Sequence, residues 1–329
     1  MTKKKRLRAL LALFSVLVLS LGLAACGGDD SSDGDGGDEG TAPAEAIVAN
    51  PDNNGVSLTI GSKNFTEQIV LGEIYAQALE AAGYEVSKDL NLGSEQIALA
   101  ALEGGDVDAY PEYTSTALTS FFEVDAADIP KDPEQAYEDT RAALADMDLT
   151  AFPPTPMTSA NAVGLLKETA DELGVSTVSD LEGISQDLSL VGSPECRQRV
   201  DCLVGLRQDY GLEFASFTPI DIGLRYSALD NGDADLSILF TTDAQLSAES
   251  DTYVILEDDQ SVFPPGNVMM IARQAAVDEA GPDFESTVEL VQGGLTEEVM
   301  QELNARVDID RQTPAETAAQ YLQESGYIE

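Results

Sequence analysis

An internal repeat places aromatic side chains at two equivalent positions of the chain. Residues 101–116 and 228–243 align at a constant offset of 127, and in this register Tyr113 aligns with Phe240. Each copy predicts a helix closed by glycine, a short acidic turn and then a strand with an aromatic and hydroxyl groups at its end. The repeat therefore predicts two similar α/β lobes that face each other.

The residue types that most enzymes need are missing from the 329-residue sequence. Histidine is absent, which removes the commonest general base and transition-metal ligand. The sequence also lacks a Gly-x-Ser-x-Gly nucleophile elbow. We therefore expect no catalytic residues, no metal site and no cofactor, and a hydrolase or lyase is the weaker hypothesis.

The charge balance is strongly acidic, with 17 Lys and Arg against 60 Asp and Glu. Such an excess argues against a nucleic-acid partner, because phosphates require cationic surface. It favours solubility and attracts cations at long range. Adaptation to a salty environment is the alternative explanation of the charge, and a calcium-dependent acidic surface lipoprotein is an alternative class of protein.

The N-terminus has the pattern of a secretory signal. A basic segment is followed by an apolar run from residue 9 to residue 25, and Cys26 comes directly after Leu-Ala-Ala. This order resembles a bacterial lipobox, in which the cysteine is lipidated. An uncleaved membrane-anchor helix is the alternative. We expect a lipoprotein signal peptide over residues 1–25 and a disordered tether rich in Gly, Asp and Ser over residues 26–54.

The folded part begins with an alternating strand over residues 56–60, followed by an octet from Gly61 to Gln68 and a helix that ends at Gly83. The octet contains Lys63 and Asn64. Its polar groups lie at a strand end and a helix N-terminus, where free backbone N–H groups point toward a cleft. N-capping by Asn64 is the alternative explanation of that residue.

Two proline-rich breaks divide the rest of the chain. They lie at residues 152–156 and 262–266 and have the composition of segments that cross between lobes. Two crossings make the first lobe discontinuous. We expect residues 56–155 with 264–329 in the first lobe and residues 156–263 in the second.

Three helix starts can be read from capping patterns. Asp132 before Pro133 predicts one N-terminus, and Thr313 with Glu316 forms a capping box around an N1 proline. Ser179 with Glu182 predicts a further capping box.

Three cysteines are present, and Cys196 and Cys202 form an even pair once Cys26 is lipidated. In an oxidising compartment such a pair favours a disulfide that closes a small loop. Two free thiols are the alternative.

Five segments together carry a family resemblance. They are Gly61–Gln68, Tyr110–Thr114, Gly223–Leu229, Thr241–Asp243 and Phe263–Pro265, and they resemble, in order and spacing, the osmoprotectant substrate-binding proteins of ABC importers. The resemblance covers residues 56–325. It implies an α/β, two-lobed periplasmic-binding-protein fold of type II, in which each lobe is a mixed sheet flanked by helices and two crossover segments join the lobes.

The ligands of this family are quaternary ammonium compounds such as glycine betaine, choline and carnitine. A quaternary ammonium has no N–H to donate, so a site recognises it by enclosing it in aromatic faces. By motif position, the aromatic box of the family falls on Tyr113, Tyr226 and Phe240. A fourth box position falls near Asn161, which departs from the aromatic pattern; Tyr110 is one candidate for the missing face.

A zwitterionic ligand also needs donors for its carboxylate. Lys63 and Arg225 are the basic residues in the motif segments. The alternatives are that Lys63 is solvated at a helix start and that Arg225 pairs with Asp221. Thr114 and Thr241 are further polar candidates, together with Asn64.

The function that the resemblance implies is extracytoplasmic capture of an osmoprotectant between two closing lobes and its delivery to an ABC permease with its ATPase. We expect a monomer, lipid-anchored through Cys26 to the outer face of the membrane. A binder of another small cationic or zwitterionic solute, such as ergothioneine or proline betaine, is the alternative.

Overall fold

The computed structural model describes residues 45–329. The predicted signal peptide, Cys26 and most of the predicted tether lie outside the described residues. The tether prediction runs to residue 54, but residues 47–54 already contact the folded part: the Ile47 N–H donates to the Tyr327 carbonyl at 2.8 Å and Asn53 is buried. A 3-10 helix, η1 (Pro51–Asn53), is capped by Asn50. Residues 47–54 therefore belong to the folded part and not to the tether.

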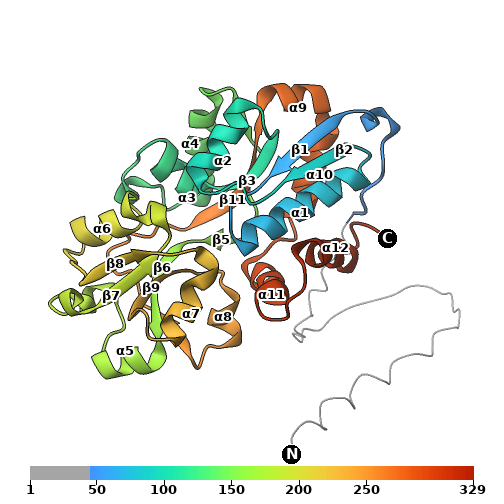
Figure 1. Cartoon of the computed structure of the whole chain (residues 1–329). Helices are drawn as coiled ribbons and strands as arrows, with labels where there is room; N and C mark the ends of the chain where they lie inside the picture. Colours follow the sequence, from blue (N-terminus) through green and yellow to red (C-terminus); the bar gives the residue numbers. More distant parts are fainter. Residues whose placement is uncertain (1–44) are drawn as a thin grey trace, which may run out of the picture. The chain divides into compact units, whose positions relative to one another are not determined.

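The first lobe is built on a six-stranded mixed sheet (Figure 1). Its strand order is β2-β1-β3-β11-β4, and β5 also pairs with β11. Strand β1 is parallel to β2 and β3, whereas β11 is antiparallel to β3, β4 and β5. The strands are β1 (Ser57–Gly61), β2 (Glu85–Asp89), β3 (Ala109–Tyr113), β4 (Leu149–Ala151), β5 (Thr158–Ser159) and β11 (Gly266–Arg273).

Helices cover both faces of this sheet. Along β11, Val268 and Met270 belong to one hydrophobic cluster and Met269 and Ile271 to another, because successive side chains of a strand point to opposite faces. The first cluster is completed by α1, α10, α11 and α12, and the second by α2 and α4. The helices are α1 (Thr66–Ala81), α2 (Glu95–Gly104), α3 (Thr114–Thr116), α4 (Pro133–Ala145), α9 (Gln274–Ala280), α10 (Pro282–Gln292), α11 (Glu297–Asp308) and α12 (Pro314–Glu324).

The second lobe has a five-stranded mixed sheet in the order β10-β6-β9-β7-β8. Strand β7 is parallel to β8 and β9, and β6 is antiparallel to β9 and β10. The strands are β6 (Asn161–Leu166), β7 (Ser189–Gly192), β8 (Ser216–Pro219), β9 (Leu236–Phe240) and β10 (Tyr253–Ile255); the helices are α5 (Lys167–Leu173), α6 (Leu203–Gln208), α7 (Arg225–Asp230) and α8 (Ala244–Ala248). The predicted α/β architecture with two mixed sheets is confirmed.

Short helical turns join these elements. They are the π-helical turn η2 (Ala117–Phe121), which continues α3, and the 3-10 helices η3 (Ala126–Asp128), η4 (Val178–Leu181), η5 (Ser185–Asp187), η6 (Pro194–Arg197) and η7 (Ile222–Leu224). The capping box at η4 is formed by Thr177 and Asp180, so the predicted pair Ser179 and Glu182 is wrong. The predicted caps at Asp132 and Thr313 are confirmed.

The repeat has the predicted structure in both lobes. Strands β3 and β9 begin and end at positions that differ by 127 residues, like the sequence repeat. The acidic turn of each copy makes an equivalent hydrogen bond to the neighbouring strand. An Asp108 Oδ accepts from the Thr59 N–H of β1 at 2.7 Å, and an Asp235 Oδ accepts from the Ser189 N–H of β7 at 2.7 Å. Each aspartate thus fixes the start of its strand against the neighbouring strand, and the strand ends carry Tyr113 and Phe240.

The passage between the lobes lies slightly later than the first predicted boundary. Strand β5 still pairs with β11 of the first sheet, and the chain enters the second sheet at Asn161. The return segment leads from β10 to the start of β11 at Gly266. Within residues 45–329, none of the helices has the length and apolar composition needed to span a membrane.

Candidate functional site

A cavity of about 60 Å³ lies between the two lobes and is lined by both. Its walls come from the segment after β1, the ends of β3 and β9, the start of β6 and the loop that contains the two cysteines. Six predicted site residues line it: Lys63, Asn64, Tyr113, Asn161, Arg225 and Phe240. We call it the inner cavity.

Three aromatic rings converge on the inner cavity. Tyr113 comes from the first lobe and Phe240 from the second, as the repeat predicts. Phe65, which the sequence analysis did not single out, lies between them: its ring centroid is 6.4 Å from that of Tyr113, nearly parallel at 17°, and 5.1 Å from that of Phe240. Its position immediately before α1, inside the Gly61–Gln68 octet, was the signal available in the sequence.

Two cations of the protein lie on these rings. The Lys63 Nζ is 4.6 Å from the Tyr113 centroid, and the Arg225 Cζ is 4.2 Å from the Phe240 centroid, both within cation–π range. Lys63 is paired with the buried Glu112. Tyr113 and Phe240 therefore each use one face for a protein cation, which leaves fewer faces for a ligand than the ring count suggests.

Arg225 pairs within the second lobe. Its Nη2 lies 2.9 Å from the Asp243 Oδ1, and the same carboxylate accepts from the Phe240 N–H and from the Tyr226 hydroxyl. The alternative of a pair with Asp221 is wrong. Because Asp243 holds Arg225, Phe240 and Tyr226 at once, it sets the geometry of this wall of the cavity.

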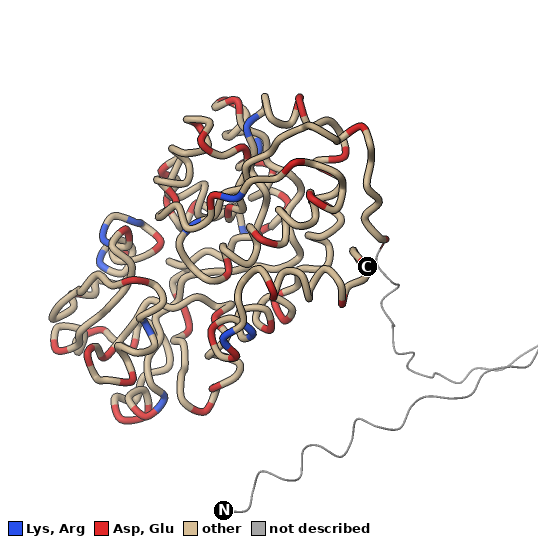
Figure 2. The backbone as a smooth tube through the Cα atoms, turned by 45° about the vertical axis from the view of Figure 1, so that its right-hand side comes forward, with Lys and Arg blue, Asp and Glu red and all other residues tan. Residues whose placement is uncertain are grey.

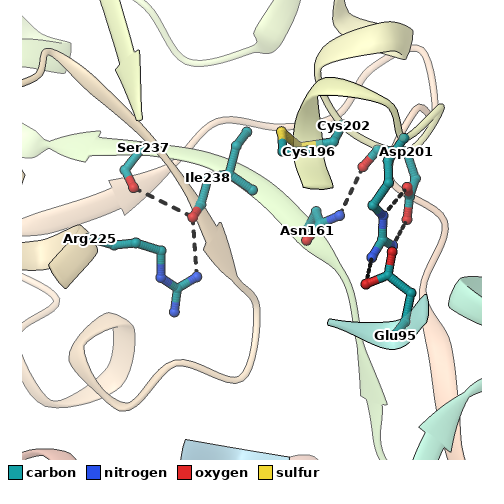
Figure 3. The surroundings of a disulfide bond; sticks show 9 residues. Glu95, Asn161, Cys196, Asp201, Cys202, Arg225, Ser237 and Ile238 are labelled. Carbon is teal, nitrogen blue, oxygen red and sulfur yellow. Dashed lines mark hydrogen bonds and ion pairs between the residues drawn. A yellow bond between two sulfur atoms is a disulfide. The ribbon is translucent and has the colours of Figure 1, made fainter. Parts of the chain in front are cut away.

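The loop between Cys196 and Cys202 contributes an arginine that the sequence analysis missed. The two cysteines form the predicted disulfide (Figure 3). Inside this loop, Arg199 Nε donates to the Asp201 Oδ1 at 2.7 Å, and its Nη1 lies 3.7 Å from the Glu95 Oε2 of the first lobe. Arg199 lines the inner cavity and links the two lobes. A loop residue that reaches the opposite lobe leaves no periodic signal in the sequence.

Neighbouring groups hold this loop in place. The Asn161 Nδ2 donates to the Asp201 carbonyl at 2.9 Å, and the Arg199 Nη2 donates to the Thr116 Oγ1 at 3.5 Å. A Cβ on Gly205 would lie 2.1 Å from the Val200 carbonyl oxygen, so only glycine lets α6 approach the loop this closely. Asn161 therefore positions the loop. It supplies no aromatic face, as its departure from the aromatic pattern of the family predicts.

Four other predicted residues lie away from the inner cavity. Tyr110 is fully buried in the cluster with α2 and α4, and its hydroxyl donates to Glu112. The Thr114 hydroxyl accepts from the Asn267 N–H, and the Thr241 hydroxyl accepts from the Ala160 N–H. Tyr226 packs edge-on against Tyr253 with centroids 4.8 Å apart and lines a second cavity. The structure therefore does not bring Tyr226 and Tyr113 to one wall.

A buried carboxyl group supports the tyrosine wall from behind. The Tyr113 hydroxyl donates to the Glu67 Oε1 at 2.6 Å, and the Asn304 Nδ2 donates to the Glu67 Oε2 at 3.1 Å. Burial raises the pKa of Glu67, against the opposing effect of its hydrogen bonds. The Asn304 Nδ2 also donates to the Thr242 carbonyl of the second lobe at 3.0 Å. The lobes thus meet through Asn304 as well as through Arg199.

The site combines charged side chains with aromatic rings. In the described part of the chain, no group of three or more Cys, Asp or Glu residues is placed to hold a metal ion. Figure 2 shows acidic residues over both lobes and few basic ones. Against that background, three cations, Lys63, Arg199 and Arg225, line the inner cavity beside its aromatic rings and balance its three carboxylates, Glu95, Glu195 and Asp201.

Comparison with known proteins identifies the family. Residues 56–324 match the family described as the substrate-binding domain of ABC-type glycine betaine transport systems. The chain belongs to this family. Its members are solute-binding components of ABC import systems, which is a non-enzymatic and extracytoplasmic role. The osmoprotectant resemblance of the sequence is confirmed.

Relatives and solved structures agree with this membership. A glycine-betaine-binding protein of Pseudomonas aeruginosa is 34% identical over 279 residues, which cover 82% of this chain and 88% of that protein. The carnitine transport binding protein OpuCC of Listeria monocytogenes is 27% identical over 325 residues, 97% of each chain. A crystal structure of a glycine betaine/carnitine/choline ABC transporter protein matches with a TM-score of 0.65 at 27% identity and covers 83% of this chain and 100% of that one. The family fold is the type II periplasmic-binding-protein fold.

Proposed function

We propose that this family member captures a quaternary-ammonium osmoprotectant of the glycine betaine, carnitine or choline type in the inner cavity. The observation that carries the proposal is the convergence of Phe65, Tyr113 and Phe240, from both lobes, on a cavity that also holds Arg199. Aromatic faces stabilise a cation that cannot donate hydrogen bonds, at about 0.5–2 kcal/mol for each ring. Three rings and a second recognised group suffice for roughly micromolar affinity.

The carboxylate of a zwitterionic ligand would lie at the cationic side of the inner cavity. Arg199 and Thr116 face each other across the lobes at 3.5 Å, and Lys63 lies on the same wall as Tyr113. All three offer donors that a carboxylate accepts well. Such a ligand would replace part of the contact between Arg199 and Glu95, and it would hold the lobes together through its own oxygens.

Two further parts of the proposal concern the membrane. A lipid on Cys26 would anchor the protein to the outer face of the cell membrane, and the closed, loaded protein would dock on an ABC permease with its ATPase. A Cys26→Ser variant is expected to lose the incorporation of labelled fatty acid that the wild-type protein shows in cells. Equal incorporation in the variant would contradict lipidation of Cys26.

Hydrogen–deuterium exchange tests where the ligand binds. Glycine betaine added to the full-length protein should slow amide exchange in residues 63–68, 113–116, 196–202 and 238–243, since these segments surround the inner cavity. Protection confined to other segments, or no protection at saturating ligand, would contradict the assignment.

A further inference from the structure

A second and larger cavity, of about 540 Å³, shares Phe65 and Phe240 with the inner cavity as lining residues. Both cavities share these two rings, whereas Tyr113 and Arg199 line only the inner one and Tyr226 and Asp308 line only the second. We call the second one the outer cavity. It too is lined by both lobes, and its volume suits a small organic ligand.

The outer cavity is acidic, unlike the inner one. Five carboxylates line it, against two arginines. One of the arginines, Arg225, is already paired with Asp243. Asp308 accepts a hydrogen bond from the Thr66 hydroxyl at 2.7 Å, and burial raises its pKa. The remaining carboxylates are Glu67, Asp230 and Glu249. With Arg225 paired to Asp243, four carboxylates share the cavity with one further arginine, Arg311, and this excess of negative charge favours a cationic occupant.

Two buried amide oxygens of residues in the walls have no hydrogen-bond donor in the described part of the chain. Asn304 is 3% exposed, and its Nδ2 donates to both Glu67 and Thr242, which fixes the orientation of the amide. Its Oδ1 has no partner within residues 45–329, and neither has the buried Oε1 of Gln245. A buried acceptor without a donor destabilises the folded state. Both residues line the outer cavity, and a ligand whose N–H groups reach these oxygens would satisfy them.

We propose that the outer cavity is a second binding site, for an organic cation that carries N–H donors, such as a protonated amine or a guanidinium. The acidic walls select positive charge, the amide oxygens select N–H donors, and the rings of Tyr226 and Tyr253 supply an apolar side. A quaternary ammonium meets the first requirement and fails the second. The two cavities therefore take different classes of cation.

Calorimetric titration of the full-length protein with agmatine tests this proposal. Agmatine carries a guanidinium and an ammonium group; tetramethylammonium is the matched cation without N–H. We expect agmatine to bind, and Asp308→Asn to weaken it roughly tenfold because a charged acceptor is lost. Asparagine keeps an oxygen for Thr66, so this variant preserves the local structure. Glu138→Gln, on the exposed face of α4, is the charge-matched control and should leave agmatine binding unchanged.

A variant of the inner cavity separates the two sites. Arg199→Gln should weaken glycine betaine and leave agmatine binding unchanged, because Arg199 does not line the outer cavity. Absence of agmatine binding, equal affinity in Asp308→Asn, or loss of agmatine binding in Arg199→Gln would each overturn the second site. None of these results bears on whether glycine betaine binds in the inner cavity, so failure of one proposal is distinguishable from failure of the other.

Discussion

The rings of Phe65 and Phe240 meet across the two lobes with their centroids 5.1 Å apart. Phe65 belongs to the segment before α1 and Phe240 to the end of β9. The two rings line both the inner cavity and the acidic outer cavity. Because the two rings come from different lobes, the aromatic enclosure of the inner cavity exists only when the lobes are together.

Tyr113 and Tyr110 should respond differently to truncation. Tyr113→Ala removes a ring of the inner cavity and is expected to weaken glycine betaine by about 2- to 30-fold, the range of one cation–π wall. Tyr110→Ala removes a fully buried side chain and should lower the free energy of unfolding by roughly 3–5 kcal/mol, with the smaller effect on affinity. Calorimetry and urea unfolding measure the two effects. A larger affinity loss for Tyr110→Ala would mean that the wrong tyrosine has been assigned to the site.

Arg199 should discriminate between ligands with and without a carboxylate. Arg199→Gln is expected to weaken glycine betaine by roughly tenfold or more, since a hydrogen bond between charged groups is lost, and to weaken choline less. Arg207→Gln is the matched control: this arginine is half-exposed, pairs with Glu213 and lines neither cavity. Equal losses for glycine betaine and choline would show that Arg199 acts through the contact between the lobes and not on the carboxylate.

The sequence predicts the positions of those site residues that are placed by local strand and turn patterns. The repeat places Tyr113 and Phe240 at opposing strand ends because strand and turn signals are local. The same pattern also separates Tyr110 from Tyr113: residues three apart in a strand point to opposite faces, so both could not line one cavity. This strand geometry could be predicted from the sequence, and it argues against Tyr110 as a wall of the inner cavity.

Other site residues depend on tertiary packing. Arg199 becomes a site residue because the disulfide loop packs against α6 and reaches Glu95, which no spacing encodes. Tyr226 lies at the start of α7, and the packing of that short helix turns its ring toward Tyr253 and the outer cavity. Motif position alone could not show whether Tyr226 lines the inner or the outer cavity.

The disulfide should support both stability and binding. A Cys196→Ser, Cys202→Ser double variant is expected to lower the free energy of unfolding by roughly 2 kcal/mol, because the closed loop is short. Affinity for glycine betaine should also fall, since Arg199 lies inside the loop. Urea unfolding and calorimetry measure these effects. An unchanged affinity would indicate that Asn161 and Glu95 hold the loop without the disulfide.

Glu67 should make stability depend on pH. Its folded-state pKa is raised above 4.5 by burial, so the folded protein binds the proton more tightly than the unfolded chain. The contribution of Glu67 to stability is therefore greatest at acidic pH and decreases as the pH rises from about 4.5 through the raised pKa. Tyr113 and Asn304 of the first lobe and Thr242 and Asp243 of the second face this carboxyl group.

A Glu67→Gln variant isolates this contribution. Glutamine cannot ionise, so the stability of the variant relative to the wild type should increase from pH 4 toward neutral pH, in urea unfolding measured at several pH values. The raised pKa of Asp308 acts in the same direction in both proteins and cancels in the comparison. A difference that does not change with pH would contradict the raised pKa of Glu67.

Calorimetric titration of the full-length protein with glycine betaine, choline, carnitine, proline betaine and ergothioneine tests the central claim most directly. We predict that at least one quaternary ammonium of the glycine betaine, carnitine or choline type binds at one site with roughly micromolar affinity, and that Tyr113→Ala weakens it. If none of the five compounds binds more tightly than about millimolar, the inner cavity is not an osmoprotectant site.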